Sequence, residues 1–297
     1  MALVGRAGVA DKPGAYGQNA RLTYSEYLKV QELLQLQQEQ SDPPVHDELQ
    51  FIVVHQVYEL WFKLILHELD AITAAVASTP ANTPAGAGSG DEAFRTAARL
   101  GRRIVSILHV LVGQIHVLES MRPVDFLAFR SKLNPASGFQ SAQFREVELV
   151  LGFKEPALMK RLATDSSAAA AVKRFAQPSL PEVLYAALRR RGLDVTPPGS
   201  ARSEAQAHAT LQALRTVYEQ PDRHSALYEL CETLLDIDEQ ITLWRRHHVM
   251  MVERQIGAKA GTGQGTTGEL DGIRYLQTTL DKRALPDLWA VRTVLEG

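Results

Sequence analysis

The sequence predicts an all-α protein built as a single helical domain. Apolar residues recur every three or four positions over long stretches, the spacing of a helix that buries one face. No convincing alternating pattern of a strand occurs, and there is no internal repeat or fibre-length heptad array. With 297 residues, 45% of them apolar and 22% charged, the chain can bury a large core.

The first part of the chain predicts a leader and two helices. Residues 1–20 are rich in Gly and Ala, and we expect a flexible leader there before a domain over 21–297. Helical spacing predicts a helix over 23–40, which the prolines of DPPV at 42–45 would end. A long helix is expected over 47–77, where the apolar spacing resumes.

A loop and two further helices follow. The Gly, Pro and Ser content of 78–90 predicts a flexible loop, and a long amphipathic helix is expected over 91–120. Pro123 suits the first turn of a short helix that carries Phe126 and Arg130.

The last part of the chain predicts the longest helix. A turn-rich loop at 133–141 precedes helices over 142–192, and TPPG at 196–199 marks a linker. The longest helix begins after Pro221 and runs to about Gly257. A glycine-rich loop at 260–268 and two short helices follow.

Composition excludes several classes of protein. The formal net charge of −2 offers no strong field for nucleic acid or an anionic membrane, and we expect Arg189–Arg191 to be a solvated helix end. The sole cysteine, Cys231, rules out an intrachain disulfide, so nothing requires an oxidising compartment. We find no signal peptide and no uncharged apolar run of about 18 residues. These features predict a cytoplasmic protein.

Two adjacent histidines near the end of the longest helix are separated by periodicity. His248 continues an apolar row and should lie on the buried face, whereas His247 belongs to a mostly polar row and should face solvent or another subunit. The first row is Leu230, Leu234, Ile237, Ile241, Trp244, His248 and Met251; the second contains Thr233, Asp236, Gln240, Leu243, His247, Met250 and Arg254.

His55 occupies a similar apolar row within FIVVHQVYELWFKLILHELD at 51–70. Its neighbours in that row are Phe51, Tyr58, Phe62 and Ile65. A histidine in such a place is usually a core side chain satisfied by a neighbour. Two of them on two long helices also suggest a shared ligand or metal pocket, and periodicity leaves both readings open.

The residues exclude most metal sites. No histidine has Glu three residues before it, as a helical di-iron site requires, and HELDA at 67–71 lacks the second histidine of a metalloprotease motif. One cysteine cannot build a zinc finger or an iron–sulfur cluster. A non-covalent haem is not excluded by the residues present, since it needs only one imidazole and a large apolar cavity.

The glycine-rich loop contains a false lead. GQGTTG at 263–268 fits the dinucleotide fingerprint G-x-G-x-x-G, but a long helix precedes it where a strand is required. We therefore reject a dinucleotide site. The loop suits a lid over a small polar substrate and a solvated loop equally well.

Several blocks recur in a recognisable order: LTYSEYL, FIVVHQVYELWFK, DFLAFR, LNPASGFQSAQFR and LWRRHHVMMVERQIGAKAGTGQGTTG. With this order and spacing, over about 21–283, the sequence resembles the tryptophan 2,3-dioxygenase family. The resemblance implies an all-helical, haem-binding catalytic domain, one non-covalent haem b per subunit and a homotetramer. In that family dioxygen is inserted across the indole C2–C3 bond of L-tryptophan. The product is N-formylkynurenine, in the first step of tryptophan breakdown by the kynurenine route.

The resemblance also implies residue roles. His248 corresponds to the proximal haem ligand and His55 to the distal histidine, which would hold the indole N–H in place and act poorly as a base. The substrate positions are Arg130 for the carboxylate, Thr262 for the ammonium and carboxylate, Phe51 and Phe126 for the indole, and Tyr24 on a segment that reaches a neighbouring subunit's pocket. Phe126 stands where some members have Tyr, so a hydroxyl contact is lost.

Two rival functions stay open at this point. A haem dioxygenase for another indole amine would keep the pocket and alter its rim, and a non-catalytic haem or indole sensor would keep His248. Arg130 and Thr262 favour a free amino acid over plain indole.

Overall fold

The computed structural model describes residues 22–81, 89–134, 136, 138–155, 168–199, 201–257, 259 and 272–296. They belong to two compact units, one ending at Glu39 and the other beginning at Gln40. Every element over the described ranges is an α- or 3-10 helix and none is a strand, so the predicted fold class is confirmed.

The first unit departs from the single helix expected over 23–40. It contains two short helices, α1 (Tyr24–Leu28) and α2 (Val30–Leu33), and 36–39 is not helical. Lys29 separates them because its backbone is left-handed, with φ of 54°, which no α-helix of L-residues accommodates.

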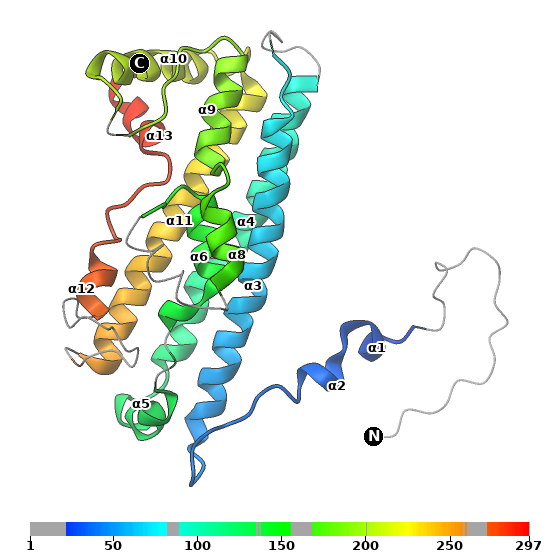
Figure 1. Cartoon of the computed structure of the whole chain (residues 1–297), viewed down its shortest axis with the longest axis vertical. Helices are drawn as coiled ribbons and strands as arrows, with labels where there is room; N and C mark the ends of the chain where they lie inside the picture. Colours follow the sequence, from blue (N-terminus) through cyan, green and yellow to red (C-terminus); the bar gives the residue numbers. More distant parts are fainter. Residues whose placement is uncertain are drawn as a thin grey trace, which may run out of the picture. The chain divides into compact units, whose positions relative to one another are not determined.

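Three long helices form the core of the second unit: α3 (His46–Ala77), α4 (Ser89–Glu119) and α11 (Ser225–Ile256). Figure 1 shows them running alongside one another, and α4 packs against both of the others. Gly101 of α4 leaves room for Thr233 of α11, since a Cβ at residue 101 would lie 2.5 Å from Cγ2 of Thr233. These helices confirm the three long helices predicted from spacing.

Shorter helices surround this core, and the longest of them, α10, was not predicted. They are α5 (Pro123–Arg130), η1 (Ser131–Leu133), η2 (Gly138–Gln140), α6 (Ala142–Val150), α8 (Ala169–Phe175), α9 (Leu180–Arg190), α10 (Glu204–Glu219), α12 (Gly272–Gln277), α13 (Pro286–Ala290) and η4 (Val291–Val294). A capping box of Ser203 and Gln206 at the start of α10 is the sequence signal for this helix.

Of the three arginines at the end of α9, Arg189 is exposed as we expected, but Arg190 and Arg191 are not a solvated helix end. Arg190 donates from Nε to the carbonyl of Thr79 at 3.0 Å, and its Nη2 bonds the last carbonyls of α3. Arg191 pairs with Asp91 at 2.9 Å, and both side chains are almost fully buried. These contacts satisfy carbonyls that a helix end leaves unpaired, and they join α9 to α3 and α4.

Asp238 of α11 fastens the C-terminal segment to the core. Its carboxylate accepts hydrogen bonds from the backbone N–H of Ala284 at 2.9 Å and of Leu285 at 3.3 Å, and from Nε1 of Trp289 at 2.9 Å. This buried carboxylate thereby holds the segment that follows α12 (Gly272–Gln277) against α11.

No single helix of the described ranges is long and apolar enough to cross a membrane. The stretches 91–119 and 123–133 meet the criteria of length and composition only as a pair, with a bend of 89° between them.

Candidate haem and substrate cavity

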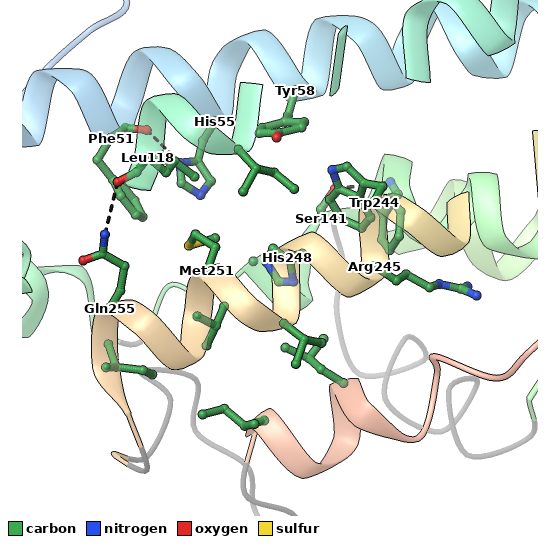
Figure 2. A pocket seen from close by; sticks show the side chains of 18 of the residues that line it. Phe51, His55, Tyr58, Leu118, Ser141, Trp244, Arg245, His248, Met251 and Gln255 are labelled. Atoms are coloured by element: carbon green, nitrogen blue, oxygen red, sulfur yellow. Dashed lines mark hydrogen bonds between the residues drawn. The ribbon is translucent and has the colours of Figure 1, made fainter. Parts of the chain in front are cut away.

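A cavity of about 280 Å³ lies between α3 and α11 and is also lined by residues of α4, α5, α6 and α12. Phe51, His55, Phe126, Arg130 and His248 all line it. Figure 2 shows His55 of α3 and His248 of α11 on opposite walls. The structure therefore brings together residues that are up to 197 positions apart in the sequence, as the resemblance implied.

His55 presents one nitrogen to the cavity and uses the other in the wall. Its Nδ1 lies 2.7 Å from the carbonyl oxygen of Phe51. Since a carbonyl only accepts, Nδ1 carries the proton and Nε2 keeps its lone pair. Burial lowers the pKa of His55, opposed by the hydrogen bond to Phe51 and the charge of Glu59. His55 is thus both a core histidine satisfied by a neighbour and a neutral acceptor facing a ligand site.

His248 and His247 are both half-buried, but only His248 faces the cavity. His248 lines the cavity and stacks on Trp244, with ring centroids 5.2 Å apart and an interplanar angle of 12°. Burial, followed by the proximity of His55 and Arg145, lowers the pKa of His248 to about 4. His247 instead meets the ring of His116 edge-on, outside the cavity lining. A neutral, buried imidazole is the form that a metal ion binds.

Aromatic rings and Arg130 make up the α5 side of the cavity. The rings of Phe51 and Phe126 are stacked with centroids 5.7 Å apart, and Phe129 meets both edge-on. Arg130 is the last residue of α5 and lines the same space as Phe126, one turn earlier. This side combines a flat apolar surface with a cation that suits a planar carboxylate.

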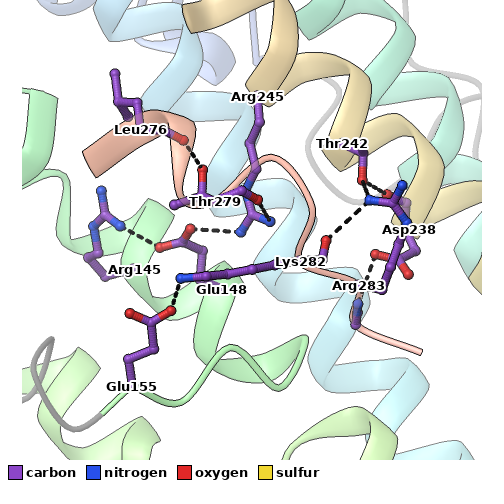
Figure 3. A network of polar contacts seen from close by, with 11 residues as sticks. Arg145, Glu148, Glu155, Asp238, Thr242, Arg245, Leu276, Thr279, Lys282 and Arg283 are labelled. Carbon is purple, nitrogen blue, oxygen red and sulfur yellow. Dashed lines mark hydrogen bonds and ion pairs between the residues drawn. The ribbon is translucent and has the colours of Figure 1, made fainter. Parts of the chain in front are cut away.

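A cationic cluster of Arg145, Glu148 and Arg245 lines another part of the cavity (Figure 3). Glu148 binds Arg145 through one oxygen and Arg245 through the other, the latter at 2.8 Å. All three residues are more than nine-tenths buried, and Nε of each arginine has no hydrogen-bond partner among the described residues. Two guanidinium groups against one carboxylate leave a net positive charge with unused donors, which fits an anionic group of a ligand.

Sequence reasoning missed this cluster. Arg145 and Glu148 are three residues apart on α6, a spacing that signals an ion pair but looks the same on an exposed helix face. Arg245 adjoins Trp244 in a basic run and gives no separate signal.

Two predicted site residues are not placed in the cavity. Thr262 lies outside the described residues. Tyr24 belongs to the first unit, where its side chain is 77% exposed. Across the described ranges no cluster of three or more His, Cys, Asp or Glu residues is arranged to hold a metal ion, and Cys231 is buried and unpaired.

The sequence matches known proteins over most of its length. The family model described as tryptophan 2,3-dioxygenase matches residues 9–198 and 157–295. The chain is 42% identical to the tryptophan 2,3-dioxygenase of Herpetosiphon aurantiacus, over 92% of this chain and 98% of that protein. It is 43% identical to the protein of that name from Nocardioides sp., over 94% and 96% of the two chains, and 41% identical to that of Anaeromyxobacter dehalogenans, over 93% and 97%.

Proposed function

Since this chain belongs to the tryptophan 2,3-dioxygenase family, we propose that its cavity holds haem b against His248 and presents L-tryptophan beside His55. The chain is an oxidoreductase that uses dioxygen to oxidise L-tryptophan, and N-formylkynurenine is the expected product. The names of the relatives favour this reaction over a different indole amine and over a non-catalytic sensor. The observation that carries the proposal is the shared cavity of His55, His248, Phe126 and Arg130.

The residues around His248 fit haem. A single neutral imidazole in an apolar cavity is what one axial ligand requires, and the low pKa of His248 keeps its nitrogen unprotonated. Haem b also carries two carboxylates, and the unpartnered Nε groups of Arg145 and Arg245 supply donors and positive charge for such groups. When bound, haem supplies the iron that activates dioxygen.

Retention of haem tests this assignment apart from turnover. Replacing Arg245 by Met should speed the loss of haem to an excess of a haem-scavenging protein by roughly tenfold or more, the effect of one lost charged hydrogen bond. Arg246→Met is the matched control, because Arg246 is adjacent on α11 and half exposed. Equal rates of loss from the two variants would remove Arg245 from the haem site.

The side chains of the cavity assign each part of tryptophan a partner. Nε2 of His55 would accept the indole N–H, because Nδ1 is already committed to the carbonyl of Phe51. The rings of Phe51 and Phe126 would pack on the indole, and the fork of Arg130 would bind two carboxylate oxygens. Thr262 is proposed for the ammonium and carboxylate from the resemblance alone. In this role His55 orients the indole ring and does not remove the indole proton.

Turnover is the direct test of the proposed function. The reduced protein with haem bound, given L-tryptophan and air, should form N-formylkynurenine, and tryptamine, which lacks the carboxylate, should be a poor substrate. Equal turnover of both would overturn the role of Arg130. Binding of tryptophan without any product would support the sensor.

We also propose a homotetramer in which Tyr24 completes a neighbouring subunit's pocket. The first unit exposes large apolar side chains, namely Leu22, Tyr24, Tyr27, Leu28, Leu33, Leu34 and Leu36, and the second exposes Leu49, Val53, Leu60, Val110 and Val117 on α3 and α4. Surfaces of this kind are typical of protein interfaces. Deleting 1–27 should impair activity, and mixing deleted chains with His248→Ala chains, which should lack haem, should restore it in confirmed mixed tetramers. A cytoplasmic location stays a prediction from the sequence.

A further inference from the structure

Gln255 is a buried amide in the cavity wall with no role in the assignments above. It lies on α11, seven residues beyond His248, and is only 8% exposed. Its Nε2 donates to the carbonyls of Leu118 at 3.2 Å and Met121 at 3.0 Å. Because both partners are carbonyls, turning the amide over would set oxygen against oxygen. The orientation of the amide is therefore fixed by the end of α4.

The amide oxygen is consequently an unused acceptor. Oε1 of Gln255 has no hydrogen-bond partner among the described residues, although it is buried. A buried acceptor without a partner costs free energy unless a ligand or water satisfies it. Gln255 also lines the cavity, so a donor on a bound ligand is a suitable partner.

Gln255 lies at the end of the cavity assigned above to the substrate. Figure 2 shows it bonded to Leu118, at the opposite end of the drawn part of α11 from Trp244 and Arg245. One of its two carbonyl partners, Met121, precedes by two residues the start of α5, the helix that carries Phe126 and Arg130.

We propose that Gln255 is a specificity residue whose Oε1 accepts a hydrogen bond from the α-ammonium group of an amino-acid substrate. This inference rests on the proposed function. Tryptophan brings two kinds of donor into the cavity, the indole N–H and the ammonium, and Nε2 of His55 accounts for the first. The ammonium has three N–H donors, so it can donate to Oε1 of Gln255 in addition to the contact proposed for Thr262. The ammonium is on the carbon that bears the carboxylate, so a substrate held by Arg130 brings both groups to the same end. A ligand without the ammonium leaves Oε1 unpaired.

Binding of two ligands to the holoenzyme without oxygen tests the proposal. Indole-3-propionate keeps the indole and the carboxylate of tryptophan but lacks the ammonium. Gln255→Met should weaken the binding of L-tryptophan by about tenfold to a hundredfold, the range for a hydrogen bond to a charged group. It should leave the binding of indole-3-propionate unchanged. Gln240→Met is the control, because Gln240 is on α11 outside the cavity lining.

A second variant covers the case in which Gln255→Met does not fold. Gln255→Lys keeps a donor for the carbonyls of Leu118 and Met121 and replaces the acceptor by a positive charge. It should weaken tryptophan binding further and leave indole-3-propionate bound as well as before or better. Equal weakening of both ligands in either variant overturns the proposal and leaves Gln255 only its link to α4. Failure of the unaltered holoenzyme to bind L-tryptophan counts against the proposed function instead.

Discussion

Replacing His55 by Ala distinguishes a group that orients the substrate from a general base. The ring is held by the 2.7 Å contact between Nδ1 and the carbonyl of Phe51, so only Nε2 can engage the indole N–H. Burial lowers the pKa of His55 below its usual value, which makes the imidazole a still weaker base. The indole N–H is far less acidic than imidazolium, so proton transfer to Nε2 is uphill.

The size of the expected loss follows from that single contact. A neutral hydrogen bond contributes about 0.5–1.5 kcal/mol, which corresponds to a drop in turnover of roughly twofold to twelvefold. Assistance by a general base contributes on the order of 10²–10⁴-fold. The two roles therefore predict losses that do not overlap.

Steady-state formation of N-formylkynurenine by the holoenzyme measures the loss. His67→Ala is the matched control, since His67 is exposed on the same helix and should tolerate the change. Tryptophan methylated at the indole nitrogen has no N–H to lose; His55 should obstruct its methyl group, whereas the Ala variant should admit it and turn it over. A loss beyond a hundredfold, with haem content and tryptophan binding intact, refutes orientation as the sole role.

Three further outcomes are expected. His248→Ala should abolish stable haem binding while His247→Ala keeps a normal haem spectrum, and the reverse result would contradict both the periodicity and the family correspondence. Arg130→Lys should weaken tryptophan binding by about 1.5–3 kcal/mol in calorimetry, because an ammonium group cannot bind both carboxylate oxygens as a guanidinium does. Unchanged affinity would argue against Arg130 as the carboxylate partner. Glu48 is buried, which raises its pKa, but its carboxylate accepts hydrogen bonds from the backbone N–H groups of Gln40 and Ser41. Together with a side-chain bond to Ser41, these bonds hold the pKa of Glu48 below its usual value. The contribution of Glu48 to the free energy of unfolding is present above the unfolded pKa of about 4.3 and is lost as pH falls through the folded pKa. Glu48→Gln should therefore lower the free energy of unfolding near pH 7 by about 1–3 kcal/mol and have a smaller effect in acid.

Periodicity was sufficient wherever a residue's neighbours on its own helix decide its environment. It separated His248 from His247 and placed His55 on a buried face, because α3 and α11 are long and regular. It also predicted a pocket between helices as one possibility, and the cavity confirms that these two faces meet.

Periodicity failed where the environment comes from another element. Arg190 and Arg245 look like solvated cations in the sequence, and only the packing of α9 on α3 and of α11 on α6 buries them. Gln255 is likewise an ordinary polar residue until the end of α4 covers it. The break at Lys29 has a local cause, a left-handed backbone that residue type does not predict for lysine.

The attachment of the C-terminal segment by Asp238 has a consequence for the order of events during synthesis. Ile273, Leu276 and Thr279 line the cavity, and they leave the ribosome after every other residue that lines it. Their position depends on Ala284, Leu285 and Trp289, which are made later still. A growing chain can therefore complete its three long helices well before the lining of the cavity is complete, and capture of the haem that we propose there would belong among the last steps of maturation.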